Sequence, residues 1–241
     1  MKFIVFADIH GNIQAFNSVA RGFSRHDKSE IICVGDIVGY GADPEGCIDL
    51  VRELGAKCVL GNHDAALVKK VDITRFNQYA AQAILWTEKN ISQRGLDYLD
   101  GLDLVFGNEY FDVVHGSLND PERFEYLLDK TDARRTFKVL KQKICFVAHT
   151  HIPMVFSYSK CLVERLPGKT FILDKDARYV VNVGSVGQPR DNDPRACYCT
   201  YDTDKQEVSF HRLEYDVEAA RDAILKEGLP VSNGNRLIYG Q

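Results

Sequence analysis

The first 60 residues alternate three short apolar runs with two amphipathic segments, and this order restricts the fold more than any other feature. The predicted strands, rich in Val, Ile and Phe, cover residues 2–7, 31–34 and 57–60. The predicted helices between them cover 12–25 and 44–54, the second opening with a proline in its first turn. This βαβαβ order predicts a parallel sheet with right-handed crossovers.

The remainder of the chain changes from helical to strand-rich patterns. Residues 65–101 have helical periodicity, and further helices are predicted near 121–128, 131–141 and 217–226. Strands are predicted near 102–106, 110–114 and 144–148, and antiparallel strands separated by turns follow to about 213. The tail after Gly228 shows only a weak pattern of apolar residues. Because no repeat or linker is visible, we expect one domain over 1–241, with 65–101 as a candidate helical cap.

Composition excludes several classes of protein. A net charge of −4 and a pI near 6.0 disfavour general binding to nucleic acid or anionic membranes, which select basic surfaces. No apolar run is long enough for a membrane span, and the apolar N-terminus is too short for a secretory signal. The seven cysteines form no CxxC pair, so we expect buried free thiols and a cytoplasmic protein.

Five short clusters of Asp, Asn and His occur along the chain, and four of them directly follow an apolar β-branched run. The oxygen and nitrogen atoms of these side chains are ligands for first-row divalent metals. In an open α/β sheet, ligands gather at the carboxyl ends of strands, which is where these clusters are expected. The clusters are Asp8-Ile9-His10, Gly35-Asp36, Gly61-Asn62-His63-Asp64, His115-Gly116 and His149-Thr150-His151.

In these motifs the chain resembles the calcineurin-like metallophosphoesterases, whose pattern is DxH, GD, GNH with an acidic residue, a lone His, and GHxH. All five motifs occur here in that order between residues 8 and 151. The one departure is Ala148, where the family usually has Gly; its methyl group should tighten the loop without removing a ligand. Residues 182–190 also resemble the corresponding loop of the small bacterial phosphodiesterase branch.

The resemblance implies two divalent cations, of manganese, iron, nickel or zinc. It implies that the first is bound by Asp8, His10, Asp36 and His151, and the second by Asp36, Asn62, His115 and His149, with Asp36 as the bridge. Two dications outweigh two carboxylates and a bridging hydroxide by about one positive charge, which suits an anionic phosphate.

Four further residues are candidates for catalysis or substrate binding. The family resemblance implies that His63 binds no metal and, with a pKa near neutrality, protonates the leaving oxygen or stabilises its charge. Asp64 either orients His63 or has a structural capping role. Asn12 either donates to phosphate or caps the helix that starts there. Arg190 either binds phosphate with its planar guanidinium or pairs with the nearby Asp191 and Asp193.

The resemblance implies an α/β fold, a sandwich of two mixed β-sheets flanked by helices, with the metals at the strand ends. It implies a phosphoesterase in which a metal-activated water attacks phosphorus in line. The expected partner is a small phosphodiester or nucleotide, dinucleoside polyphosphates included. A phosphoprotein phosphatase is the enzymatic alternative, and a non-catalytic interaction scaffold on the same fold is the other. The oligomeric state is left open.

Overall fold

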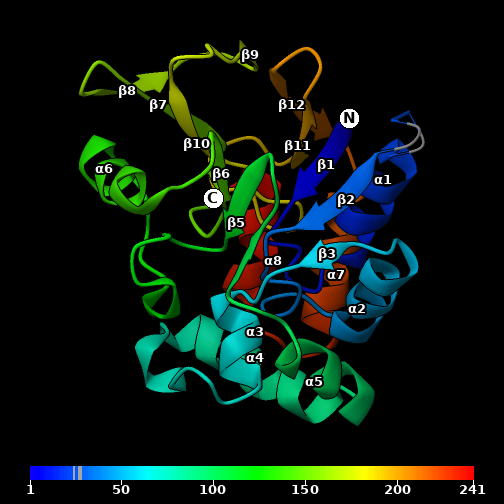
Figure 1. Ribbon diagram of the computed structural model, residues 1–241. Coiled ribbons are helices and arrows are strands. Elements are labelled where there is room, and N and C mark those ends of the chain that lie inside the picture. Colours follow the sequence, from blue (N-terminus) through cyan, green and yellow to red (C-terminus); the bar gives the residue numbers. More distant parts are fainter. Residues whose placement is uncertain (24, 27–28) are drawn as a thin grey trace.

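The computed structural model describes residues 1–23, 25–26 and 29–241, and its strands form two six-stranded sheets (Figure 1). The first sheet has the order β3 (Lys57–Cys58), β2 (Glu30–Cys33), β1 (Lys2–Phe6), β11 (Ala196–Asp202), β12 (Glu207–Leu213) and β9 (Thr170–Ile172). The second has the order β4 (Val105–Gly107), β5 (Phe111–Val114), β6 (Ile144–Val147), β10 (Arg178–Asn182), β7 (Met154–Ser159) and β8 (Leu162–Leu166).

Both sheets are mixed. In the first, β1, β2 and β3 are parallel, as the βαβαβ order predicts, while β1 pairs antiparallel with β11. In the second, β6 is parallel to both β5 and β10, and β10 pairs antiparallel with β7. The sandwich of two mixed sheets expected from the family resemblance is therefore confirmed.

The strands bury side chains on both faces, which makes a layered core. Phe3 and Val5 of β1 point between the sheets and pack in the central cluster with Phe111 and Phe146. The alternate residues of β1 point outward, because side chains on a strand alternate between its faces. There they meet α1 (Ile13–Phe23) and α2 (Pro44–Glu53). On the other outer face, α6 (Lys130–Val139) covers the second sheet.

The stretch predicted to be helical at 65–101 contains α3 (Asn62–Leu67), the 3-10 turn η1 (Ile73–Arg75), α4 (Gln78–Asn90) and α5 (Gln93–Asp100). In Figure 1 these elements lie together at the edge of the molecule beyond the β2 and β3 ends. Asn77 caps α4 by accepting from the amides of Tyr79 and Ala80. The helices expected in this stretch are therefore present, and their role as a cap stays a prediction.

Two predictions from the sequence were wrong. The helix expected at 121–128 is only the 3-10 turn η2 (Pro121–Arg123), because Phe124 adopts a left-handed backbone with φ 50° that ends it. The tail after Gly228, for which the weak pattern predicted no element, forms α8 (Val231–Tyr239), which packs on α7 (Val217–Lys226).

All seven cysteines are free thiols, and five of them are buried; Cys58 is half-buried and Cys161 is exposed.

No helix within residues 1–23, 25–26 and 29–241 has both the length and the apolar character needed to cross a bilayer.

Candidate metal centre

The five polar clusters converge where strands of both sheets end. Asp8 and His10 follow β1, Asp36 follows β2, His115 follows β5, and the pair His149 and His151 follows β6. Asn62 and His63 open α3 just beyond β3. The carboxyl ends of parallel strands share one edge of a sheet, which is why residues so distant in sequence meet here.

Five of these residues have left-handed backbone conformations although none is glycine. The φ angles lie between 52° and 69° for Asp8, His10, Asp36, His149 and His151. Each such residue costs roughly 1–2 kcal/mol, because its Cβ approaches the following carbonyl oxygen. Strain of this kind persists only where the surrounding structure enforces it, and it concentrates at functional sites.

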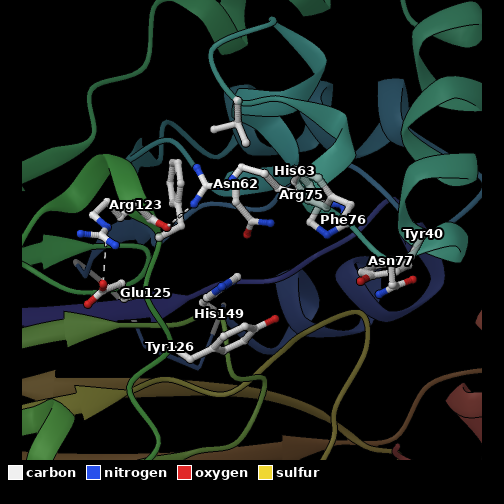
Figure 2. Close-up of a pocket in the computed structure, with 12 residues that line it drawn as sticks. Tyr40, Asn62, His63, Arg75, Phe76, Asn77, Arg123, Glu125, Tyr126 and His149 are labelled. Atoms are coloured by element: carbon white, nitrogen blue, oxygen red, sulfur yellow. Dashed lines mark hydrogen bonds and ion pairs between the residues drawn. The ribbon is translucent and has the colours of Figure 1, made fainter.

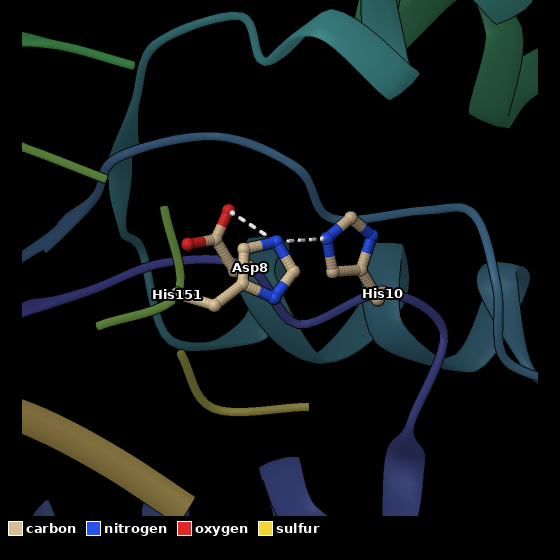
Figure 3. A group of neighbouring side chains, drawn as sticks. All are labelled: Asp8, His10 and His151. Atoms are coloured by element: carbon tan, nitrogen blue, oxygen red, sulfur yellow. Dashed lines mark hydrogen bonds and ion pairs between the residues drawn. The ribbon is translucent and has the colours of Figure 1, made fainter. Parts of the chain in front are cut away.

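The first group consists of Asp8, His10 and His151, all buried, with candidate ligand atoms within 4.8 Å of one another (Figure 3). The Nε2 atoms of His10 and His151 are 3.1 Å apart. Oδ1 of Asp8 lies 3.8 Å from Nε2 of His151. Three ligand atoms therefore surround one small volume.

The second group consists of Asp36, His115 and His149. Nε2 of His115 is 3.2 Å from Oδ2 of Asp36, 3.2 Å from Nδ1 of His149 and 3.1 Å from Oδ1 of Asn62. The same Oδ2 of Asp36 lies 3.6 Å from Nε2 of His10 in the first group. Asp36 thus stands between the two groups, where the family resemblance implies a bridging carboxylate.

The residues of both groups fit bound cations. Nδ1 of His10, His115 and His151 each lies 2.6–3.0 Å from a backbone carbonyl oxygen, so each ring donates there. Their Nε2 lone pairs then face the centre, as in metal-binding histidines whose other nitrogen is held by a backbone acceptor. The buried oxygens Asp8 Oδ1 and Asp36 Oδ2 have no hydrogen-bond partner among the described residues. A cation in each group satisfies these atoms.

Burial and charge set the protonation of the centre. Burial raises the pKa of Asp8 to about 8. Burial alone lowers the pKa of His115, but the Asp36 and Asp8 carboxylates outweigh it and raise that pKa to about 9. Burial holds the pKa of His10, His149 and His151 well below the usual range. Ligands must be deprotonated to bind metal, so a cation competes with protons mainly at Asp8 and His115.

His63 lies beside both groups. Its backbone amide donates to Oδ1 of Asp36 at 2.9 Å, and its ring packs against Tyr40 and Phe76 with centroids 4.6 and 5.1 Å away. The ring also lies on Gly39, where an added Cβ would be 2.4 Å from His63 Nδ1. Burial lowers the pKa of His63 to about 4, which corrects the near-neutral pKa expected from the sequence.

Asp64 binds the backbone around Asp36. Its Oδ1 accepts from the amides of Ile37 and Val38 at 3.0 and 3.2 Å, and its Oδ2 accepts from Gly61 at 3.1 Å. The carboxylate thereby joins the loop after β2 to the start of α3, and both segments carry ligands. These bonds favour the structural role over orientation of His63.

Asn12 has the geometry of a helix cap. Its Oδ1 accepts from the amide of Ala15 at 3.0 Å, and its Nδ2 donates to the carbonyl of Gly187 at 2.9 Å. Both ends of the side chain are therefore engaged within the protein, and its amide ties α1 to the 182–190 loop.

Arg190 is directed toward the centre instead of toward its neighbouring carboxylates. It donates to Gln188 Oε1 at 2.7 Å and lies 5.7 Å from the centroid of the Tyr40 ring. Asp191 and Asp193 pair with other arginines. Nε of Arg190 is buried without a partner among the described residues.

Ala148, the departure from the family pattern, fits without strain. Its amide donates to the carbonyl of His115 at 2.9 Å, and its own carbonyl accepts from Asn182 at 2.6 Å. Its methyl group packs in the central core.

A cavity of about 520 Å³ opens from the centre, and it exposes residues that the sequence analysis missed (Figure 2). The Tyr126 ring stacks on His149 with centroids 3.9 Å apart and an angle of 17° between the planes. The full lining is Tyr40, Asn62, His63, Val71, Arg75, Phe76, Asn77, Arg123, Phe124, Glu125, Tyr126 and His149. Sequence motifs could not identify Tyr126, because its segment reaches the centre only through the tertiary fold.

Comparison with known proteins agrees with this geometry. A solved metallophosphoesterase from Sphaerobacter thermophilus is 34% identical, with a TM-score of 0.88 and complete coverage of both chains. A solved hypothetical protein from Pyrococcus horikoshii has the same fold, with a TM-score of 0.81 at 21% identity, over 100% of this chain and 98% of that one. An uncharacterized protein from Methanocaldococcus jannaschii is 40% identical over 98% of this chain and 97% of its own.

The sequence model of the calcineurin-like phosphoesterase superfamily domain matches residues 1–206, a range that contains both ligand groups. The match covers well over half of the chain. This chain therefore belongs to the calcineurin-like phosphoesterase superfamily.

Proposed function

We propose that this protein is a two-metal phosphoesterase that hydrolyses small phosphodiesters or nucleotides, dinucleoside polyphosphates included. The observation that carries the proposal is the pair of buried ligand groups with Oδ2 of Asp36 lying near both. Asp8, His10, Asp36 and His151 would hold the first cation, and Asp36, Asn62, His115 and His149 the second. Bound there, the two cations polarise the phosphoryl group and lower the pKa of the attacking water.

The chain's own residues supply the remaining functions. Arg190, with its buried and unpartnered Nε, donates to a phosphoryl oxygen. His63, whose ring centroid lies 4.8 Å from that of His10, protonates the leaving oxygen. An anionic phosphate beside the imidazole raises its pKa from about 4, because a neighbouring negative charge favours the protonated form. Asp64 keeps the two ligand loops together, and Asn12 holds α1 against the loop that carries Arg190.

The test is a panel of assays on the full chain loaded with manganese, iron, nickel or zinc. The panel contains a phosphomonoester, a phosphodiester, a cyclic nucleotide, a diadenosine polyphosphate and a phosphoserine peptide. We expect metal-dependent hydrolysis of a diester or nucleotide that a chelator abolishes. Preference for the phosphopeptide would favour a phosphoprotein phosphatase, and no turnover with any metal would favour an interaction scaffold.

A further inference from the structure

The cavity beside the metal centre is much larger than one phosphate group requires. Its volume is about 520 Å³, within the range of sites that take whole small molecules. Only Asn62, His63 and His149 of its lining belong to the centre and its neighbouring imidazole. The other walls come from residues 75–77 at the junction of η1 and α4, from residues 123–126, and from Tyr40 and Val71, so the space continues away from the reacting phosphate (Figure 2).

The 123–126 wall is held by a strained backbone. Asp120 and Phe124 on either side of η2 have φ of 55° and 50°, which non-glycine residues rarely adopt. The Phe124 side chain is buried in a small cluster with Leu60 and Ala65. The burial of Phe124 enforces the left-handed backbone of this residue. It leaves the nearby Arg123 and Tyr126 in the cavity wall.

Two arginines of the wall provide positive charge that the protein does not fully neutralise. Arg75 donates to the backbone carbonyl of Arg123 at 3.3 Å, which joins η1 to η2 across the cavity (Figure 2). No carboxylate of the described residues lies within ion-pair distance of Arg75. Arg123 shares Glu125 with Arg135, at 3.5 and 3.2 Å. Arg135 also pairs with Asp132 at 3.1 Å, so Glu125 and Asp132 together offset Arg123 and Arg135. The Arg75 guanidinium has no carboxylate partner among the described residues and remains available.

The same cavity exposes an aromatic face. The Tyr126 ring stacks on His149, yet 49% of the residue is exposed. Phe76 lines the opposite part of the cavity and contacts His63 edge-on. A planar heterocycle stacks favourably on such rings, because every nucleobase offers a π face.

We propose that this cavity binds the part of the substrate beyond the scissile phosphate, and that this part is a nucleoside carrying at least one further phosphate. Arg75 and Arg123 bind the additional phosphate, and Tyr126 stacks on the base. The substrate class is thus a nucleoside polyphosphate or dinucleoside polyphosphate. The inference rests on the proposed function, since it places the scissile phosphate at the metal centre.

The test uses the manganese-loaded full chain and two substrates. Diadenosine tetraphosphate carries additional phosphates, whereas bis(p-nitrophenyl) phosphate carries an aromatic group and no additional phosphate. We expect Arg75→Gln and Arg123→Gln each to lower kcat/KM for the tetraphosphate about ten-fold or more relative to the diester, the effect of losing a charge-assisted hydrogen bond. Arg94→Gln, which removes an exposed α5 arginine outside the cavity, should leave the ratio unchanged.

Equilibrium binding separates this inference from the proposed function. In a His63→Ala background, calorimetry should show tighter binding of the tetraphosphate than of adenosine monophosphate, with the difference reduced by Arg75→Gln and partly restored by Arg75→Lys. Arginine-dependent binding without any hydrolysis would overturn the proposed function and retain the inference. If both arginine variants fold and hydrolyse substrate with an unchanged ratio of kcat/KM for the tetraphosphate to kcat/KM for the diester, the inference would be overturned and the function retained. Thermal melting of each variant identifies any that fail to fold.

Discussion

The Nε2 atoms of His10 and His151 lie 3.1 Å apart, although each imidazole donates its Nδ1 hydrogen to a backbone carbonyl. Two nitrogen lone pairs therefore face each other in a buried space. Such an arrangement is repulsive without a cation and favourable with one, because both lone pairs then become ligands.

Removal of metal should therefore destabilise the fold. A cation supplied at about 100 times its dissociation constant stabilises by about 2.7 kcal/mol. For a chain of this size that corresponds to roughly 5–10 °C in Tm. Differential scanning calorimetry after dialysis against a chelator, with and without added manganese, measures the shift. Equal Tm values in the two samples would argue against a metal centre.

Asp36→Asn should remove metal as well as activity. Asp36 Oδ2 is the atom near both ligand groups, and an amide lacks the negative charge that holds two dications. Metal content by mass spectrometry should fall from two ions per chain toward none. The exposed carboxylate of Asp97 on α5 provides the control variant Asp97→Asn, which should keep both ions. Full retention of both ions in Asp36→Asn would refute the bridge.

His63→Ala should lose turnover while keeping its metals. The imidazole contacts the ligand groups but is absent from the ligand set that the family motifs imply, so its removal leaves the cation sites complete. General acid catalysis contributes about 10²–10⁴-fold, and kcat should fall within that range. Unchanged kcat with normal metal content would exclude the role given to His63.

Gly39→Ala should displace the His63 ring. The new methyl group would lie 2.4 Å from Nδ1, at a residue with φ of 92°. We expect kcat to fall toward that of His63→Ala with metal content retained. Gly55→Ala is the matched control, since its φ is 63° but no atom lies within 4 Å of the added Cβ. Equal activity of the two variants would show that the ring is not held by Gly39.

Asp64→Ala should lower the free energy of unfolding more than the substitution of a purely catalytic residue would. Three backbone amides, of Ile37, Val38 and Gly61, lose their acceptor in a buried region. Each unsatisfied buried donor costs about 1–3 kcal/mol, so unfolding in urea should occur at clearly lower concentration. A stable variant with reduced kcat alone would instead support the orientation of His63 by Asp64.

The convergence of the candidate ligands could be predicted from the sequence because each one follows directly from a local pattern. Asp8, Asp36 and His149 come just after an apolar run, and such a run ends where its strand leaves the sheet. The parallel pairing of β1, β2 and β3 then follows from the order of elements along the chain.

Other features depend on contacts that no local pattern shows. The helix expected at 121–128 ends early because the burial of Phe124 enforces a left-handed backbone. That same turn exposes Tyr126 in the cavity, so the residue stacked on His149 could not be identified. α8 contains Asn233, Gly234 and Asn235, which are poor helix formers, and the helix is stabilised by the packing of Leu237 on α7. The low pKa of His63 comes from burial, which the sequence does not reveal.

The position of β1 also has a consequence for biosynthesis. This strand, which leads into Asp8, lies between β2 and β11, and Val5 pairs with Cys199 near the far end of the chain. A ribosome that has translated the last histidine ligand, at position 151, has not yet made the strand that completes the middle of this sheet. Contacts of such long sequence separation form slowly. We therefore expect the candidate metal centre to be completed only after β11 has been synthesised.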